Sequence, residues 1–357
     1  MLEARGAVRR LKEYHPPLGG RVGLRLDFNE NTVGCSPRVL ERLRQLQFDQ
    51  LARYPERESV ERQVAAHLGV DSAGLLLTNG VDEAIHLICE TYLEPGDEVL
   101  IVVPTFSMYE IYAGATGARV ITIPAAADFS YPTEQVLARV SPRTRLIAIA
   151  NPNNPTGAVV PGNELLRILR TAPDAAVLVD EAYFDFYGES MLAEVASFPN
   201  LFVARTFSKA YGLAGLRIGV LVGSAGQMTM VRRVSSPYNV NAVALACLPE
   251  ALADQDYIRQ YVDEVRQGRE QIEQELRSLK LRFWPSQANF VLVKIGERHD
   301  AFVRAMRERG ILVRDRSRDS GCDGCVRISV GSKAQTGQLI PALREAVRAI
   351  AVAGVSA

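Results

Sequence analysis

The sequence predicts an α/β protein: a large domain whose mostly parallel sheet is flanked by helices, joined to a smaller α/β domain. The first observation is a series of short apolar runs between residues 70 and 225, each bounded by turn residues, as buried strands are. The second is that helical patterns alternate with these runs, which is typical of parallel strands joined by crossover helices. The third is the length of 357 residues, enough for about two domains of common size.

We expect residues 1–50 to form an extended arm and a short helix around 37–46, with the arm contributing to the small domain. The large domain is expected over residues 51–255. Its apolar runs predict strands at 75–78, 99–103, 119–123, 146–150, 177–179, 201–204 and 218–222, and its helical patterns include 82–92 and 162–171.

Residues 256–279 form a long, charged amphipathic pattern that predicts a helix leading out of the large domain. It opens the C-terminal small domain, residues 256–357. There we expect strands at 290–293 and 326–330 and helices at 299–309 and 333–350, and we expect Val313-Arg314-Asp315 and Val326-Arg327-Ile328 to lie on adjacent strands.

The charge balance and the N-terminus exclude several classes of protein. Lys plus Arg and Asp plus Glu each number 41, so net charge gives no reason to expect a nucleic acid as partner. The charged residues 1–10 lack the apolar stretch of a signal peptide, and no apolar run is long enough to span a bilayer. We therefore expect a soluble cytoplasmic protein without a membrane partner.

The five cysteines are odd in number and scattered, so they do not predict a disulfide framework. Cys322 and Cys325 form a CxxC, a spacing found in metal and redox sites. There is no second CxxC and no neighbouring pair of histidines, so a pair of loop thiols is the favoured interpretation. The four histidines are isolated from one another in the sequence, and no metal site is expected.

Four segments with candidate chemistry follow predicted strands of the large domain, where ligands of open α/β sheets bind. The first is Thr78-Asn-Gly-Val-Asp-Glu83. Gly80 allows a close backbone turn, and the N–H groups of Val81 and Asp82 at a helix start are suited to hold a phosphate. A capped turn without a ligand is the alternative interpretation.

The next two segments place polar groups at the ends of apolar strands. Asn151-Pro-Asn-Asn-Pro-Thr-Gly157 is a rigid loop, and its two X-Pro steps fix a backbone that can aim the side chain of Asn154. In Asp180-Glu-Ala-Tyr183, a buried Asp180 would need a partner, and a protonated ring nitrogen is a suitable one. Tyr183 can direct its hydroxyl to the same place. A helix cap is the alternative role for Asp180.

The fourth segment, Thr206-Phe-Ser-Lys-Ala-Tyr-Gly-Leu-Ala-Gly-Leu-Arg217, is a loop rich in hydroxyls and glycines. It contains Lys209, with Arg217 eight residues further on. A desolvated lysine near other cations has a lowered pKa and becomes a nucleophile toward an aldehyde. Most lysines lie on the surface and are not nucleophiles. The presence of the other three segments is what favours a catalytic role for Lys209.

Taken in order, the segments 151–157, 180–183 and 208–217 resemble the fold-type I aminotransferases (class I/II) over nearly the whole chain. Further segments are similar to the histidinol-phosphate aminotransferase branch: Asp27-Phe-Asn-Glu-Asn31, Arg53-Tyr-Pro55, Pro104-Thr-Phe-Ser-Met-Tyr109, Pro237-Tyr-Asn-Val-Asn241, Gly310-Ile-Leu-Val-Arg-Asp315 and Cys325-Val-Arg-Ile-Ser-Val-Gly331. Two positions depart from the branch, Thr32 for the usual Pro and Phe106 for the frequent Tyr.

The resemblance implies the fold of type I transferases dependent on pyridoxal 5′-phosphate (PLP) and a role for each central residue. Lys209 would hold the cofactor as a Schiff base and shuttle the proton, and Asp180 would keep the pyridine nitrogen protonated. Asn154 and Tyr183 would hydrogen-bond the 3′-oxygen. Phe106 would stack on the ring.

The resemblance also implies binding sites for the two ends of the ligands. The cofactor phosphate would be held by Val81, Asp82, Thr206, Ser208 and Arg217. Tyr54 would reach the phosphate in a neighbouring subunit, which implies a homodimer. Arg327 would clamp the substrate α-carboxylate as a bidentate pair, while Arg314 and Tyr14 are candidates for the distal, phosphate-bearing end.

The function so implied is a transaminase of histidine biosynthesis. It would exchange an amino group between glutamate/2-oxoglutarate and histidinol phosphate/imidazole-acetol phosphate. Threonine-phosphate decarboxylases share much of this branch, so a PLP-dependent decarboxylase of a phosphorylated amino acid is an alternative, as is an aromatic amino acid aminotransferase. A PLP-binding transcription regulator is disfavoured, because only about 25 residues precede Asn29, too few for an added helix-turn-helix segment.

Overall fold

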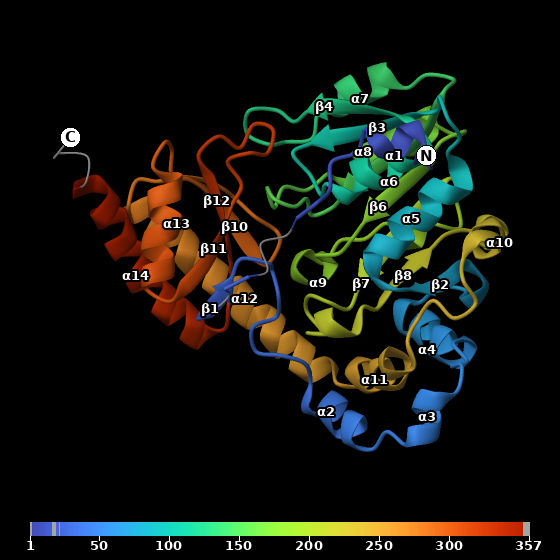
Figure 1. The fold of residues 1–357 in the computed structure, drawn as a ribbon, viewed down its shortest axis with the longest axis horizontal. Helices are drawn as coiled ribbons and strands as arrows, with labels where there is room; N and C mark the ends of the chain where they lie inside the picture. Colours follow the sequence, from blue (N-terminus) through green and yellow to red (C-terminus); the bar gives the residue numbers. More distant parts are fainter. Residues whose placement is uncertain (1, 16–18, 21, 353–357) are drawn as a thin grey trace.

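The computed structural model describes residues 2–15, 19–20 and 22–352, and it contains two sheets that lie side by side (Figure 1). The larger sheet has the order β2-β8-β7-β6-β5-β3-β4. Its strands are β2 (Leu75–Thr78), β3 (Glu98–Val103), β4 (Arg119–Pro124), β5 (Thr144–Ala150), β6 (Ala176–Asp180), β7 (Leu201–Thr206) and β8 (Gly219–Val222). All seven predicted strands are therefore confirmed, with ends that differ by at most two residues.

The larger sheet is mostly parallel, as predicted. Strands β3, β4, β5, β6 and β7 pair in parallel, whereas β8 is antiparallel to both β2 and β7. All five residues of β6 are buried, because helices cover both faces of the sheet.

Successive residues of each strand point to opposite helical layers. Leu76, Leu178 and Phe202 pack against α5 (Gly80–Tyr92), α6 (Met108–Thr116) and α10 (Ala225–Val234). Leu77 and Val179 belong to the opposite layer, with α4 (Glu58–Leu68), α8 (Gly162–Thr171) and α11 (Ala242–Ala253). The remaining helices of this part are α1 (Gly6–Arg9), α2 (Pro37–Arg44), α3 (Phe48–Ala52), α7 (Thr133–Arg139) and α9 (Phe184–Tyr187).

The smaller sheet has the order β1-β11-β12-β10-β9 and combines the two ends of the chain. Its strands are β1 (Leu24–Leu26), β9 (Arg282–Trp284), β10 (Phe290–Lys294), β11 (Ile311–Asp315) and β12 (Cys325–Ser329). Strand β1 pairs in parallel with β11, so the N-terminal arm joins the small domain as expected. Strand β9 and the short helix α1 were not predicted.

Helix α12 (Gln255–Ser278) runs from the larger sheet to the smaller one (Figure 1). With α13 (His299–Glu308) and α14 (Lys333–Val352) it packs on the smaller sheet, and their buried apolar residues share one core with the larger sheet. We propose the domain boundaries expected from the sequence, near residues 50 and 255. Within the described residues, no helix is long and apolar enough to cross a membrane.

Candidate active site

A cavity of about 280 Å³ lies where β5, β6 and β7 end, since Ala150, Asp180 and Thr206 all line it. This is the carboxyl edge of the parallel strands, where ligands of open α/β sheets bind. Every candidate residue from the sequence except Tyr54 lines this cavity: Tyr14, Val81, Asp82, Phe106, Asn154, Asp180, Tyr183, Thr206, Ser208, Lys209, Arg217, Arg314 and Arg327.

Lys209 is half-buried in the loop that follows β7. Its Nζ donates to the backbone oxygen of Phe28 at 3.3 Å and lies 5.9 Å from the centroid of the Tyr183 ring. Phe28 follows β1 in the N-terminal arm, so this arm helps to enclose the lysine. The amine therefore faces the cavity between the large domain and the arm.

Asp180 ends β6 and only 4% of its surface is exposed. One carboxylate oxygen accepts from the hydroxyl of Tyr109 at 2.6 Å, and the other accepts from the backbone N–H of Ala182 at 3.0 Å. Burial nevertheless raises the pKa of Asp180 to about 6, against an ordinary value of 3.8. A cation placed in the cavity next to this carboxylate would relieve the penalty of ionising it.

Asn154 and Tyr183 each form a hydrogen bond that the sequence did not predict. Asn29 donates from Nδ2 to the Tyr183 hydroxyl at 2.9 Å, so the phenol keeps its own hydrogen to donate. The Oδ1 of Asn154 accepts from Nη1 of Arg327 at 2.5 Å, which leaves the Asn154 amide hydrogens for another acceptor. Both side chains thus offer a donor to a ligand oxygen.

The start of α5 lines a further part of the cavity, close to Arg217. Gly80 has a φ of +73°, and a Cβ at this position would lie 2.7 Å from Nη2 of Arg217. That nitrogen donates to the Asp82 carboxylate at 2.8 Å. The hydroxyls of Thr206 and Ser208 lie 2.9 Å apart beside them. Helix N–H groups, hydroxyls and a guanidinium together form a site for an anion.

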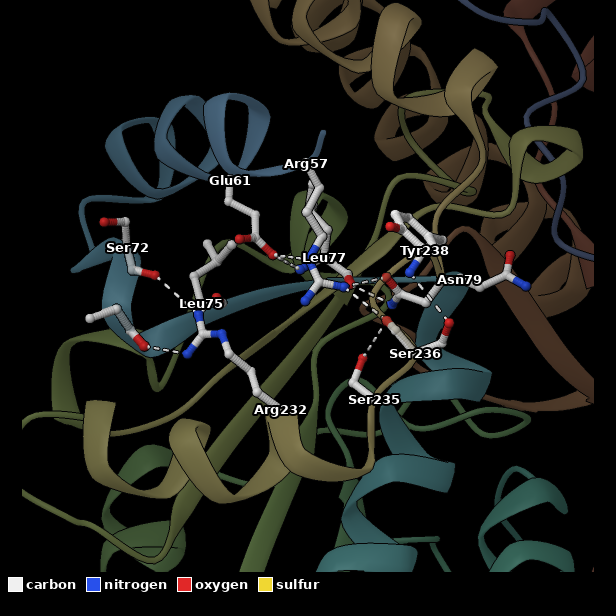
Figure 2. Close-up of polar contacts among 12 residues, drawn as sticks. Arg57, Glu61, Ser72, Leu75, Leu77, Asn79, Arg232, Ser235, Ser236 and Tyr238 are labelled. Carbon is white, nitrogen blue, oxygen red and sulfur yellow. Dashed lines mark hydrogen bonds and ion pairs between the residues drawn. The ribbon is translucent and has the colours of Figure 1, made fainter. Parts of the chain in front are cut away.

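A polar network joins the end of β2 to the start of α5, and its contacts around Arg57 and Leu77 are drawn in Figure 2. Glu83 accepts from the backbone N–H of Asn79 at 2.5 Å and from the Asn239 amide at 2.8 Å. Asn239 also donates to the backbone oxygen of Leu77 at 2.9 Å and accepts from Arg57 at 2.6 Å. The network ties the end of β2 and the helix start to the segment that carries Tyr238.

Tyr54 lies outside the cavity of its own chain. It is 77% exposed, and its ring stacks on Tyr238 with centroids 4.2 Å apart. The single chain therefore leaves Tyr54 accessible to a neighbouring molecule. Cys322 and Cys325, the CxxC pair, are buried with Phe129 and Trp284 and do not line the cavity.

The arginines of the small domain lie on paired strands, as predicted. Arg314 of β11 stands directly opposite Arg327 of β12 in the antiparallel register. Arg327 is 5% exposed, and its Nη2 donates to the backbone oxygen of Asp27 at 2.7 Å. Burial, followed by the nearby charge of Arg316, lowers the pKa of Arg327 to about 9. Desolvated guanidinium groups of this kind bind carboxylates and phosphates.

Among the cavity residues that were not proposed from the sequence are three with polar side chains: Asn29, Tyr109 and Arg316. Asn29 and Tyr109 lie in segments that resemble the histidinol-phosphate aminotransferase branch. Their hydrogen-bond partners, Tyr183 and Asp180, could not be predicted from the sequence. Arg316 follows Arg314 by two residues, a spacing that directs both side chains to one face of a strand. This two-residue spacing is the sequence feature from which Arg316 could have been predicted to face the cavity.

Residues 21–343 match the family described as "Aminotransferase class I and II". A histidinol-phosphate aminotransferase of a Geobacillus species is 37% identical over 91% of this chain and 90% of its own length.

Two solved structures are similar over nearly their whole length. The histidinol-phosphate aminotransferase of Sinorhizobium meliloti, in complex with pyridoxal-5′-phosphate, superposes with a TM-score of 0.86 at 28% identity and covers 98% of this chain and 99% of its own. The L-threonine-O-3-phosphate decarboxylase of Porphyromonas gingivalis gives 0.77 at 25% identity, over 90% of this chain and 98% of its own.

Proposed function

The chain belongs to the aminotransferase class I and II family, and from this premise we propose a specific reaction for it. The enzyme is a PLP-dependent transaminase that exchanges an amino group between glutamate/2-oxoglutarate and histidinol phosphate/imidazole-acetol phosphate. The observation that carries the proposal is the convergence of Lys209, Asp180 and Arg327 on one cavity. A lysine amine, a buried carboxylate and a buried guanidinium are the groups that this chemistry requires.

The residues present fit the cofactor at three points. Asp180 is a buried carboxylate whose pKa is raised by burial, and a protonated pyridine nitrogen beside it would stabilise its charged form. Gly80 leaves room beside Arg217 that a Cβ would fill, which suits a phosphate at the start of α5. The Phe106 ring also lines the cavity and offers a stacking face.

PLP, when bound, supplies an aldehyde that combines with amines and a ring that accepts electrons. Lys209 would hold the cofactor through its Nζ, and this amine would take up and return the proton of the substrate carbon that bears the amino group. Asp180 would keep the ring nitrogen protonated. Asn154 and Tyr183 would donate hydrogen bonds to the ring oxygen.

The substrate end is assigned to the small domain. Arg327 binds the α-carboxylate of glutamate, and Arg314 beside it binds the phosphate of histidinol phosphate or the side-chain carboxylate of glutamate. Tyr14, which also lines the cavity, borders the same end. Because a transaminase takes two substrates of different shape in one pocket, the paired arginines are suited to serve both in turn.

We infer that the enzyme works as a cytoplasmic homodimer in which Tyr54 reaches the cofactor phosphate of the partner. Supporting this, Tyr54 lies outside its own cavity, and Phe48 and Leu51 in the same segment are 85% and 58% exposed. Exposed apolar side chains gathered in one segment are typical of an interaction surface.

Half-reaction spectra test the proposed substrate. We expect the PLP form to convert with histidinol phosphate and with glutamate. Carboxyl-labelled threonine phosphate separates the alternative reaction, since a decarboxylase releases the label and a transaminase retains it. Conversion that is faster with phenylalanine than with histidinol phosphate would contradict the substrate assignment and favour an aromatic aminotransferase.

A further inference from the structure

Three guanidinium groups of the small domain face the same cavity. Arg314 and Arg327 are cross-strand partners, so their side chains share one face of the sheet. The backbone N–H of Arg316 donates to the oxygen of Cys325 at 2.9 Å, which extends the pairing beyond the end of β11. Arg316 is two residues from Arg314 and therefore lies on this face as well. All three line the cavity that holds Lys209.

Each of these arginines has a buried side-chain nitrogen that has no hydrogen-bond acceptor among the described residues. Within the described residues, Nη1 of Arg314, Nε of Arg316 and Nε of Arg327 have no hydrogen-bond partner. Buried polar groups in folded proteins nearly always have a hydrogen-bond partner. Three unpaired donors on one face of the smaller sheet therefore indicate that a ligand binds there. A carboxylate offers two oxygens, whereas a phosphate monoester offers three that are not bridging.

The local charges point in the same direction. Arg316 forms an ion pair with Asp319, which fixes the guanidinium at one edge. The positive charges of Arg316 and Arg314 both lower the pKa of Arg327, and Asp319 opposes them as a smaller effect. Like charges on facing strands repel one another, so an anion bound between these arginines would stabilise the arrangement.

We propose that Arg316 is a specificity-determining residue that binds the phosphate of a phosphorylated substrate together with Arg314 and Arg327. The proposal rests on the proposed function and adds a residue to it. Asp319 positions the guanidinium of Arg316. The three unpaired nitrogen donors are equal in number to the three non-bridging oxygens of the phosphate. A single carboxylate, which has two oxygens, leaves one of the three donors unmatched.

Arg316→Gln in the holoenzyme tests this assignment, with Arg318→Gln as the matched control. Arg318 is an exposed arginine of the same loop that lines only the neighbouring cavity of about 550 Å³. We expect Arg316→Gln to raise KM for histidinol phosphate on the order of ten- to a hundredfold, as for a lost charged hydrogen bond. The value of kcat and the KM for glutamate should change much less, and Arg318→Gln should resemble the wild type.

Inorganic phosphate supplies a readout that does not depend on the identity of the substrate. It should inhibit the half-reaction with glutamate more strongly in the wild type than in Arg316→Gln. If histidinol phosphate is not converted at all, the proposed function fails, but phosphate inhibition still tests Arg316. Equal inhibition of the wild type and Arg316→Gln would overturn the role of Arg316, as would an equal loss in Arg318→Gln.

A charge-retaining variant covers the case in which Arg316→Gln does not fold. Arg316→Lys keeps a cation beside Asp319 but loses the second nitrogen of the fork. We expect it to bind phosphate more weakly than the wild type while its KM for glutamate is preserved. Unchanged inhibition by phosphate in Arg316→Lys would also count against the proposal.

Discussion

Replacing Asp180 by Asn should stabilise the cofactor-free enzyme at neutral pH. Burial raises the pKa of Asp180 from 3.8 to about 6, so the folded state resists ionisation of this carboxyl. Below the unfolded pKa the acid is protonated in both states and carries no penalty. As the pH rises through 3.8 and then 6, the unfolded state ionises first and the free energy of unfolding falls.

The size of the effect follows from the shift. Each pKa unit corresponds to about 1.4 kcal/mol, so the full penalty is about 3 kcal/mol and its change between about pH 4.5 and pH 7.5 is about 2 kcal/mol. Asn can keep both hydrogen bonds, because its oxygen accepts from the Ala182 N–H and its amide donates to the Tyr109 oxygen. Equilibrium urea unfolding of the wild type and Asp180→Asn across this pH range measures the difference.

Asp185→Asn is the matched control for the cofactor. Burial also raises the pKa of Asp185 to about 6, yet this residue does not line the cavity. Adding PLP should remove the pH-dependent difference between Asp180→Asn and the wild type, because the ring nitrogen pairs with the carboxylate. The difference for Asp185→Asn should persist. A difference at Asp180 that does not vary with pH, or an equal response of both sites to PLP, would refute the reasoning.

Three kinetic measurements, one on the same variant and two on further variants, test the remaining roles. Asp180→Asn in the holoenzyme should lower the single-turnover rate on the order of 10²–10³-fold, because a neutral amide cannot hold the ring nitrogen protonated; near-normal rates would reduce Asp180 to a structural role. Arg327→Lys should lower kcat/KM for every amino acid, since an ammonium cannot make the two-pronged contact. Arg314→Ala should lower kcat/KM for histidinol phosphate by a factor worth about 1.5–3 kcal/mol more than it lowers kcat/KM for phenylalanine or leucine, and equal losses would exclude phosphate recognition.

Much of the fold followed from the sequence because the signals are local. The strands of the larger sheet are short apolar runs bounded by turns, and burial between two helical layers is what makes them apolar. Strand β9 escaped prediction because three residues, Arg282–Trp284, are too few to show a period. Helix α1 has four residues, none of them buried, and so carries no apolar pattern.

The candidate site was predictable where a segment carries its own chemistry, and less so where distant segments meet. Lys209 and Asp180 follow apolar strands whose parallel arrangement brings their ends together. By contrast, Asn29 reaches Tyr183 across 154 positions of the chain, and the pairing of Tyr109 with Asp180 depends on how α6 packs. Such contacts are set by tertiary packing, and a single sequence holds no direct signal of them.

The site of covalent attachment of the cofactor tests the central claim most directly. The purified enzyme should absorb as a Schiff base, and borohydride reduction should fix a pyridoxyl group to one lysine. Peptide mapping should find that group on Lys209, and Lys209→Ala should lose it while retaining the fold. A pyridoxyl label on any other lysine, or an enzyme that takes up no label, would contradict the account.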